Sequence, residues 1–308
     1  MLDWANFDVV FQQKPNFSYD SKTVEQIRRR RKDFDGKLFF DRILESIGLK
    51  QVTRLYPPTT NSELRTLFDK IVKTGSADYQ KHALIYYILK DCSRHLSNAD
   101  QQFVRQVYLP SKYLILITGL WELDRGHLSN AVDCLTDPSL MPTFTDEILY
   151  TLIKHEKPGD GLAMSYYLSV SPPLADDKVL NAYFDLLTES SVSEAYNFAQ
   201  KQPDLQHRQL FERLIVSIHT HRTGEDRATR AIELVALPFT AEEEAWFEEC
   251  LLYGSAQQYQ NAKDTLIVRR IALGKDPGGI GALDRNRGPK IDGTNWDDLR
   301  LSLQKTKS

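Results

Sequence analysis

The most constraining feature of this sequence lies within residues 107–135. It is a long stretch that is apolar on nearly all helical faces, followed at once by a segment that is apolar on one helical face only. Pro110 ends any helix before it, and residues 111–125 then carry apolar side chains on almost every helical face. Gly126 can end that helix, and apolar residues return at helical spacing from Leu128 onward. These two helices must fold back on each other as a hairpin, and we expect further helices to bury the first one on all sides.

The same pattern of amphipathic segments and breakers continues along most of the chain. About fourteen segments with helical periodicity are separated by short loops that contain glycine or proline. No pair of strand-like segments is joined by hairpin turn residues, and no strict 34-residue period indicates a regular tetratricopeptide array. The predicted fold class is therefore all-α, an irregular α-solenoid of stacked helical hairpins.

Three regions with different composition are predicted. Residues 1–19 form an apolar N-terminal arm, and residues 20–274 form the α-helical solenoid domain. Residues 275–308 are rich in Gly, Asp, Asn and Lys, so we expect a mostly disordered tail. Trp296 and Leu299 belong to a short apolar island in that tail, which is either a segment that orders on binding a partner or a fraying end.

Two segments offer aromatic residues and prolines for an interface with another protein. They contain Trp4, Phe7 and Phe11 in the arm, and Tyr56, Pro57 and Pro58 in a loop. For the arm, the alternative is packing on its own domain. The loop is stiff and extended, because each proline restricts its own backbone and that of the preceding residue.

A run of five basic residues consists of Arg28, Arg29, Arg30, Arg31 and Lys32. Such a run is typical of a nuclear-import signal or a patch that binds nucleic-acid phosphates. On a helix, however, consecutive side chains spread around the cylinder. The alternative is therefore a solvated or salt-bridged helix end.

No pattern in the sequence indicates catalysis. The chain lacks a P-loop, GxSxG and HExxH, and its three cysteines are far apart without a CxxC, so we expect no enzyme, cofactor, metal or small-molecule substrate. A formal net charge of -3 makes the molecule as a whole a poor binder of nucleic acid. No apolar run is long enough to span a membrane. The residues alone thus predict a helical interaction scaffold.

Several ordered elements together resemble the ELYS-like domain of nuclear pore assembly factors. In chain order they are LFFD at 38–41, YPP at 56–58, LP-x-KY at 109–113, W-x-LD at 121–124 and LxxPSL at 135–140. Their large apolar residues, which we expect in the core, are Leu38, Phe39, Tyr113, Trp121 and Leu123. The chain is most similar to the short, fungal type of this family.

This resemblance implies a non-enzymatic structural nucleoporin of the nuclear pore complex, in the nuclear envelope, that contributes to pore assembly. It implies docking on the short arm of the Y-shaped outer-ring complex. The partners there are a scaffold nucleoporin built of a propeller plus helices and the adjacent WD-repeat nucleoporin. Animal members also bind chromatin through AT-hooks, whose nearest counterpart here, at residues 287–290, lacks the second arginine of the core. A chromatin or nucleic-acid adaptor that uses the basic segments is the alternative.

Overall fold

The structure, a computed structural model, describes residues 2–12, 14, 17–93, 95–96, 98–220, 224–259 and 261–274. Within these residues every regular element is a helix, and no helix is both long and apolar enough to cross a membrane. The all-α fold class is confirmed, and successive helices pack on one another in the manner of an α-solenoid. The predicted tail, with Trp296 and Leu299, lies outside the described residues.

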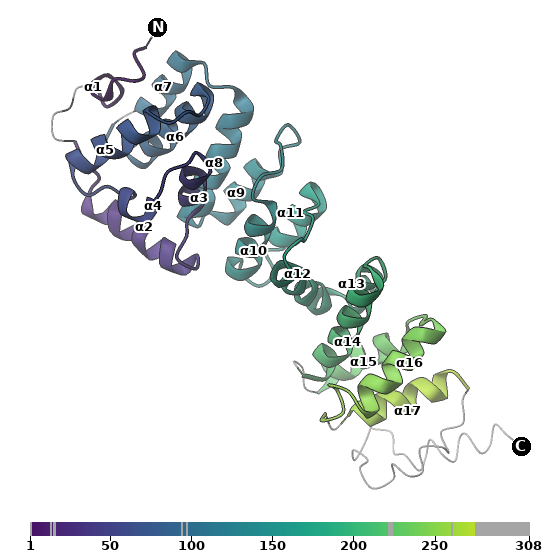
Figure 1. The fold of residues 1–308 in the computed structure, drawn as a ribbon. Helices are drawn as coiled ribbons and strands as arrows, with labels where there is room; N and C mark the ends of the chain where they lie inside the picture. Colours follow the sequence, from purple (N-terminus) through teal and green to yellow (C-terminus); the bar gives the residue numbers. More distant parts are fainter. Residues whose placement is uncertain are drawn as a thin grey trace, which may run out of the picture. The chain divides into compact units, whose positions relative to one another are not determined.

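The chain divides into two compact units, and unit 1 comprises Met1–Leu174. Its helices are α1 Phe7–Val10, α2 Ser21–Asp33, α3 Phe39–Ser46, α4 Val52–Leu55, α5 Asn61–Val72, α6 Asp78–Asp91, α7 Ala99–Val107, α8 Ser111–Arg125, α9 Leu128–Leu135, α10 Thr145–His155 and α11 Leu162–Val170. The longest of them, α8, packs against α2, α3, α6 and α9 (Figure 1). The predicted hairpin is therefore the pair α8 and α9.

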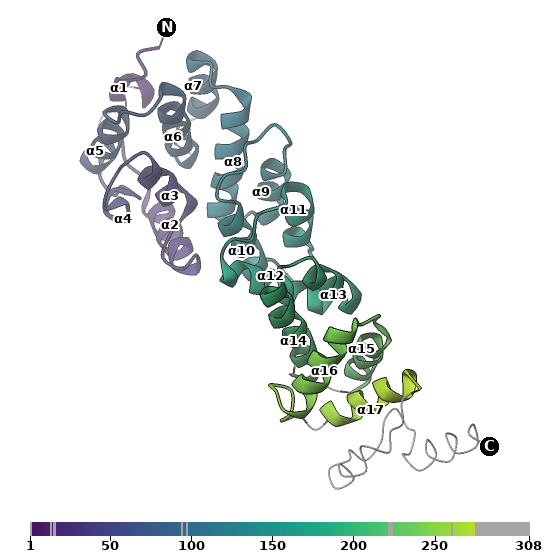
Figure 2. The same cartoon turned by 45° about the vertical axis from the view of Figure 1, so that its right-hand side comes forward.

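Unit 2 comprises Ala175–Ser308. Its helices are α12 Asp177–Ser190, α13 Val192–Gln200, α14 Asp204–Thr220, α15 Glu225–Ala236, α16 Ala241–Leu252 and α17 Ala262–Ala272. Within this unit, α14 lies beside α13, α15 and α16 (Figure 2). The division between the units, after residue 174, falls inside the region 20–274 that was expected to form one helical domain. The expected domain boundaries near residues 20 and 274 stay predictions.

Local side-chain chemistry explains where many helices begin and end. Asp20 begins α2, since its carboxylate accepts a hydrogen bond of 2.6 Å from the backbone N–H three residues later. Thr60 and Thr240 cap α5 and α16 in the same way. Gly126 ends α8 with a φ of 78°, a left-handed conformation that glycine adopts without strain.

The N-terminal arm packs on its own unit. The rings of Phe7 and Phe11 stack at 4.5 Å, and Phe7 meets Phe68 of α5 edge-on at 5.5 Å. Phe7 and Phe11 are both buried. Of the two alternatives for the arm, packing on its own domain holds for Phe7 and Phe11, and an exposed interface at these two residues is corrected, because α5 covers them.

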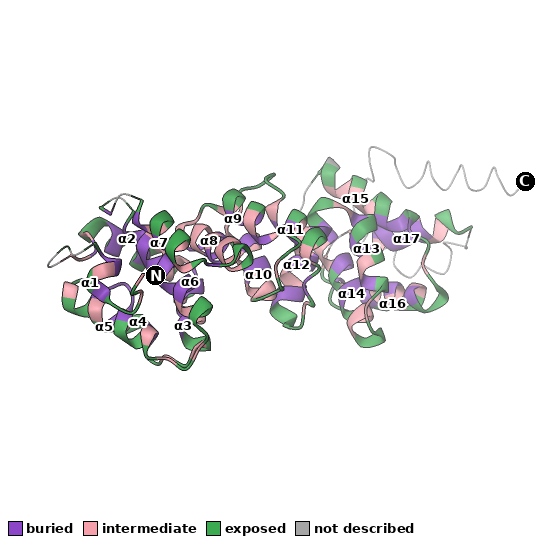
Figure 3. Ribbon diagram, turned by 90° about the horizontal axis from the view of Figure 1, so that it is seen from above, coloured by how far each residue is buried: buried purple, intermediate pink, exposed green. Residues whose placement is uncertain are grey.

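The helix α8 is not buried on all sides, which corrects the sequence expectation. Leu120 and Leu123 are fully buried, whereas Ile115, Leu116 and Trp121 are only partly covered, as the pink residues on α8 in Figure 3 illustrate. The four helices packed against α8 do not enclose its whole circumference. Apolar composition alone therefore overestimated its burial.

Candidate functional site

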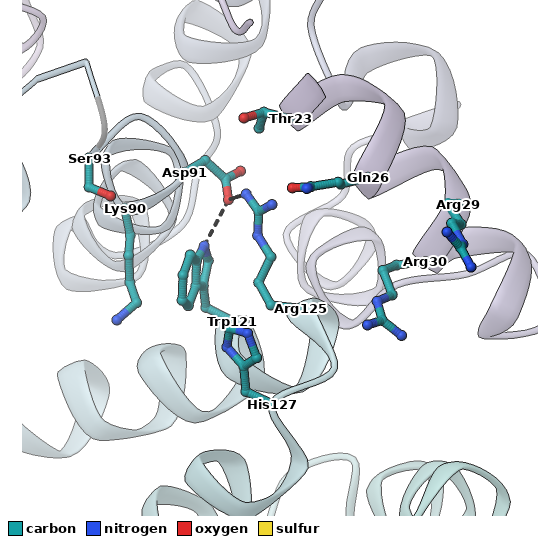
Figure 4. Close-up of a pocket in the computed structure, with 10 residues that line it drawn as sticks. All are labelled: Thr23, Gln26, Arg29, Arg30, Lys90, Asp91, Ser93, Trp121, Arg125 and His127. Atoms are coloured by element: carbon teal, nitrogen blue, oxygen red, sulfur yellow. Dashed lines mark hydrogen bonds and ion pairs between the residues drawn. The ribbon is translucent and has the colours of Figure 1, made fainter. Parts of the chain in front are cut away.

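A hollow of about 450 Å³ opens on unit 1 between α2, α6 and the C-terminal part of α8 (Figure 4). Its main lining residues are Arg29 and Arg30 of α2, Lys90 and Asp91 of α6, and Trp121 and Arg125 of α8. We call it the α2–α6–α8 pocket. It brings together part of the basic run and the tryptophan of the family element W-x-LD.

The buried carboxylate of Asp91 organises the floor of this pocket. One of its oxygens accepts hydrogen bonds from the hydroxyls of Tyr19 at 2.9 Å and Tyr56 at 2.6 Å. The other accepts from the indole N–H of Trp121 at 2.7 Å and from Arg125 at 2.6 Å. Burial, together with the charge of Asp91, raises the pKa of both tyrosines well above the ordinary value, so the phenols stay protonated donors.

Trp121 forms an aromatic wall between two cations. The Lys90 ammonium lies 4.4 Å from the centre of its ring and the Arg125 guanidinium lies 5.3 Å away. Both distances suit cation–π attraction. Trp121 therefore lines the pocket and is partly exposed, which differs from the core position expected for it.

The pocket carries more positive than negative charge. Asp91 and Arg125 neutralise each other, and Lys90 lies 3.6 Å from Glu122. Arg29 is exposed, and the Arg30 side chain is 43% exposed with only a 3.9 Å contact to a carboxylate. Among the described residues, no group of three or more potential metal ligands comes together. The arrangement is suited to binding anionic groups.

The basic run does not form one patch. Arg31 donates two hydrogen bonds of 2.8 Å to the buried carboxylate of Asp41 and a third to the backbone oxygen of Tyr56. Arg31 is thus part of the fold. Arg28 and Lys32 are exposed beside a second hollow of about 550 Å³, which also contacts Arg29 but not Arg30.

The remaining family-element residues hold α3 against α8. Leu38, Phe39 and Leu123 are buried, and Asp124 accepts hydrogen bonds from the backbone N–H groups of Phe39 at 2.8 Å and of the next residue at 2.9 Å. The hydroxyl of Tyr87 donates a third bond at 2.8 Å. Burial raises the pKa of Asp124 to about 7, although these three donors oppose the shift. Asp124 therefore caps α3 from another helix.

The other candidate interface residues lie elsewhere in unit 1. Tyr56, Pro57 and Pro58 are buried, so their predicted surface role is corrected, because the Tyr56 hydroxyl is used inside the fold by Asp91. Trp4 is partly exposed and packs edge-on against a histidine ring at 4.6 Å. Tyr113, which was expected in the core with the other family-element residues, is partly exposed instead and stacks on another tyrosine at 4.4 Å.

Sequence reasoning did not identify Lys90, Asp91 or Arg125. These residues are far from the basic run in the sequence. No spacing pattern in the sequence predicts that residues of α2, α6 and α8 come together. The only signal was a charged pair at the end of an otherwise apolar helix, ALIYYILKD.

Comparison with known proteins identifies the family. The family model ELYS, described as nuclear pore complex assembly, matches residues 37–254, more than half of the chain. This chain belongs to the ELYS family. The match confirms the resemblance to the ELYS-like domain that was found in the sequence. It also confirms the expected location at the nuclear pore complex, in the nucleus. The match includes α6 and α8 of the pocket, whereas the α2 cations precede it.

This ELYS-family chain is similar in sequence to two further proteins. It is 30% identical over 188 residues to "Uncharacterized protein ely5" of Schizosaccharomyces pombe, which covers 60% of this chain and 61% of that protein. It is 25% identical over 314 residues to "Protein ELYS" of Xenopus laevis, which covers 96% of this chain and 12% of the frog protein. The chain thus spans less than two thirds of either relative.

Proposed function

We propose that this chain is a non-enzymatic structural nucleoporin that docks through its helical domain on the short arm of the Y-shaped outer-ring complex. The observation that carries the proposal is the ELYS family match, whose description is nuclear pore complex assembly. The stacked helices of both units support it, since such stacks present large surfaces to protein partners.

The proposed partners are the scaffold nucleoporin built of a propeller plus helices and the WD-repeat nucleoporin beside it. Among the described residues, the exposed large apolar side chains are scattered over several helices and loops, including Tyr108, Met141 and Leu168 in unit 1. Because they are scattered, a polar or charged surface is the better basis for specific docking.

The test is size-exclusion chromatography with light scattering on this chain mixed with the purified short-arm heterodimer. We expect a complex of one copy of each protein. The matched control is a helical nucleoporin from another part of the pore, which should elute separately from the heterodimer. A folded chain that elutes separately as well would contradict the proposal.

A nucleic-acid adaptor is the second candidate, favoured by the exposed side chains of Arg28, Arg29 and Lys32 on α2. Each phosphate contact steepens the salt dependence of binding by roughly one unit of logarithmic slope. If these residues contact DNA, Arg28→Ala with Lys32→Ala should therefore flatten the slope measured by fluorescence anisotropy. An unchanged slope would exclude this surface.

A further inference from the structure

We propose that the α2–α6–α8 pocket is the docking site for an acidic peptide segment of a protein partner. The carboxylates of the segment pair with Arg29, Arg30 and Arg125, and an apolar side chain beside them packs on Trp121. This inference rests on the proposed function, because it names the surface and the partner chemistry of the docking.

The first support is the positive charge that the pocket leaves available. Arg29 has no carboxylate partner among the described residues, and Arg30 has only the distant one at 3.9 Å. Arg125 is neutralised by Asp91 and adds donors rather than net charge, because it uses one terminal nitrogen for Asp91 and a guanidinium carries five N–H donors. Cations from α2 and α8 thus line one hollow (Figure 4).

The second support is that two of the contact groups are already held in place. Trp121 and Arg125 both bond the same buried oxygen of Asp91, at 2.7 and 2.6 Å. A ligand therefore does not have to order these side chains, and this lowers the entropic cost of binding. A rigid tryptophan beside an arginine is also the residue combination that dominates binding energy in protein interfaces.

The Arg30 side chain reaches from α2 to the end of α8. A Cβ atom at Gly126 would lie 2.6 Å from the guanidinium carbon of Arg30, so this guanidinium lies directly over Gly126. Arg30 therefore lines the same pocket as Arg125 and Trp121.

The surroundings favour a peptide over a nucleic acid. Glu122 and Asp33 lie beside the cations, and the chain has a formal net charge of -3. A strand of regularly spaced phosphates would pass these carboxylates at close range, which is repulsive. A peptide presents a few carboxylates at fixed points and apolar side chains between them. It therefore fits a hollow of about 450 Å³ with one aromatic wall.

The test uses a fluorescein-labelled ten-residue peptide of glutamate and leucine, titrated with the full chain and followed by anisotropy. The pocket variant is Arg29→Ala with Arg30→Ala. The matched control is Arg28→Ala with Lys32→Ala, which removes the same charge from the same helix but away from the pocket. We expect the pocket variant to bind about tenfold more weakly and the control less than about twofold, as loss of specific ion pairs predicts.

Equal weakening by both variants would overturn the proposal, because it would show attraction to general positive charge. Binding of a single-stranded oligonucleotide that the pocket variant loses, without binding of the acidic peptide, would also overturn it in favour of nucleic acid. Melting curves of both variants verify that they fold, as expected for side chains that are exposed or, for Arg30, only partly buried.

The same two variants, mixed with the short-arm heterodimer, separate this inference from the proposed function. Loss of the complex in the pocket variant alone would support both. A complex that forms equally with both variants would overturn the pocket while leaving the docking function in place. Failure of the unmodified chain to form a complex would overturn the proposed docking function. The peptide titration alone would then test whether the pocket binds acidic peptides.

Discussion

At the residue scale, Asp91 connects three parts of unit 1 that are distant in sequence. Its donors come from the segment before α2, from the loop after α4 and from α8. A buried carboxylate is stable only when donors compensate for its lost hydration, and here four donors do so. The same bonds fix the aromatic wall of the pocket, so stability and the candidate site depend on one side chain.

Asp91→Ala should lower the free energy of unfolding by about 3–5 kcal/mol, because it leaves the charged Arg125 and three neutral donors without their acceptor. Urea unfolding followed by circular dichroism measures the loss. Asp33→Ala is the control, since its contact with Arg30 is exposed and should contribute less than about 1 kcal/mol. Equal losses in the two variants would disprove the role given to Asp91.

His219 of unit 2 should make stability depend on pH. Burial lowers its pKa from the ordinary 6.5 to about 4, and neither ring nitrogen has a hydrogen-bond partner among the described residues. Below pH 6.5, His219 binds a proton more readily in the unfolded chain than in the folded one. The free energy of unfolding should therefore decrease as the pH is lowered from 6.5 to 4. The contribution is at most about 3 kcal/mol.

The measurement is urea unfolding at several pH values for the unmodified protein and for His219→Leu. Leucine has no titrating group, so the difference in unfolding free energy between the two proteins should change over this pH range and level off below it. A difference that stays constant with pH would show that folding does not lower the pKa of His219.

At the element scale, the α8–α9 hairpin depends on close approach of its two helices. A Cβ atom at Gly119 would lie 2.7 Å from the Leu135 side chain and 3.0 Å from the Cβ of Cys134. These atoms belong to the packed face of α9, where Leu135 is buried. The hairpin predicted from the sequence therefore requires a small residue in the middle of an otherwise large-residue helix.

Gly119→Ala should destabilise the protein by up to about 2 kcal/mol, since an overpacking cost of about 1–3 kcal/mol outweighs a gain in helix propensity of about 1 kcal/mol. Thermal melting provides the comparison. Gly75→Ala is the control, because a Cβ there would meet nothing within 4 Å. A Gly119→Ala protein as stable as this control would show that α9 can move away without cost.

At the scale of the whole molecule, the division at residue 174 predicts that unit 1 folds independently. One cluster of buried apolar residues, which runs from Phe7 to Ile117, lies entirely within the unit. A protein of residues 1–174 should therefore show one cooperative transition in scanning calorimetry.

The control ends at residue 135 and lacks α10 and α11, of which α11 packs on α9. It should melt several degrees lower, on the order of 2–4 °C for each kcal/mol lost. A broad, uncooperative transition for residues 1–174 would show that unit 1 needs the rest of the chain.

The sequence by itself determined most of the helices, several of their ends and the family, but not the short helices α1 and α4. These properties depend on neighbouring residues: apolar spacing marks a helical face, Thr240 with Glu243 begins α16, and Gly126 ends α8. The family elements are likewise short and ordered along the chain.

Only the tertiary structure decided which charged and aromatic residues act together. Arg31 and Arg30 are neighbours in sequence, yet Arg31 is bound by buried Asp41 and Arg30 faces the pocket. Similarly, the apolar spacing of α8 does not reveal that Trp121 is partly exposed beside Lys90. Such groupings arise from contacts between helices separated by tens of residues, and local periodicity carries no information about those distances.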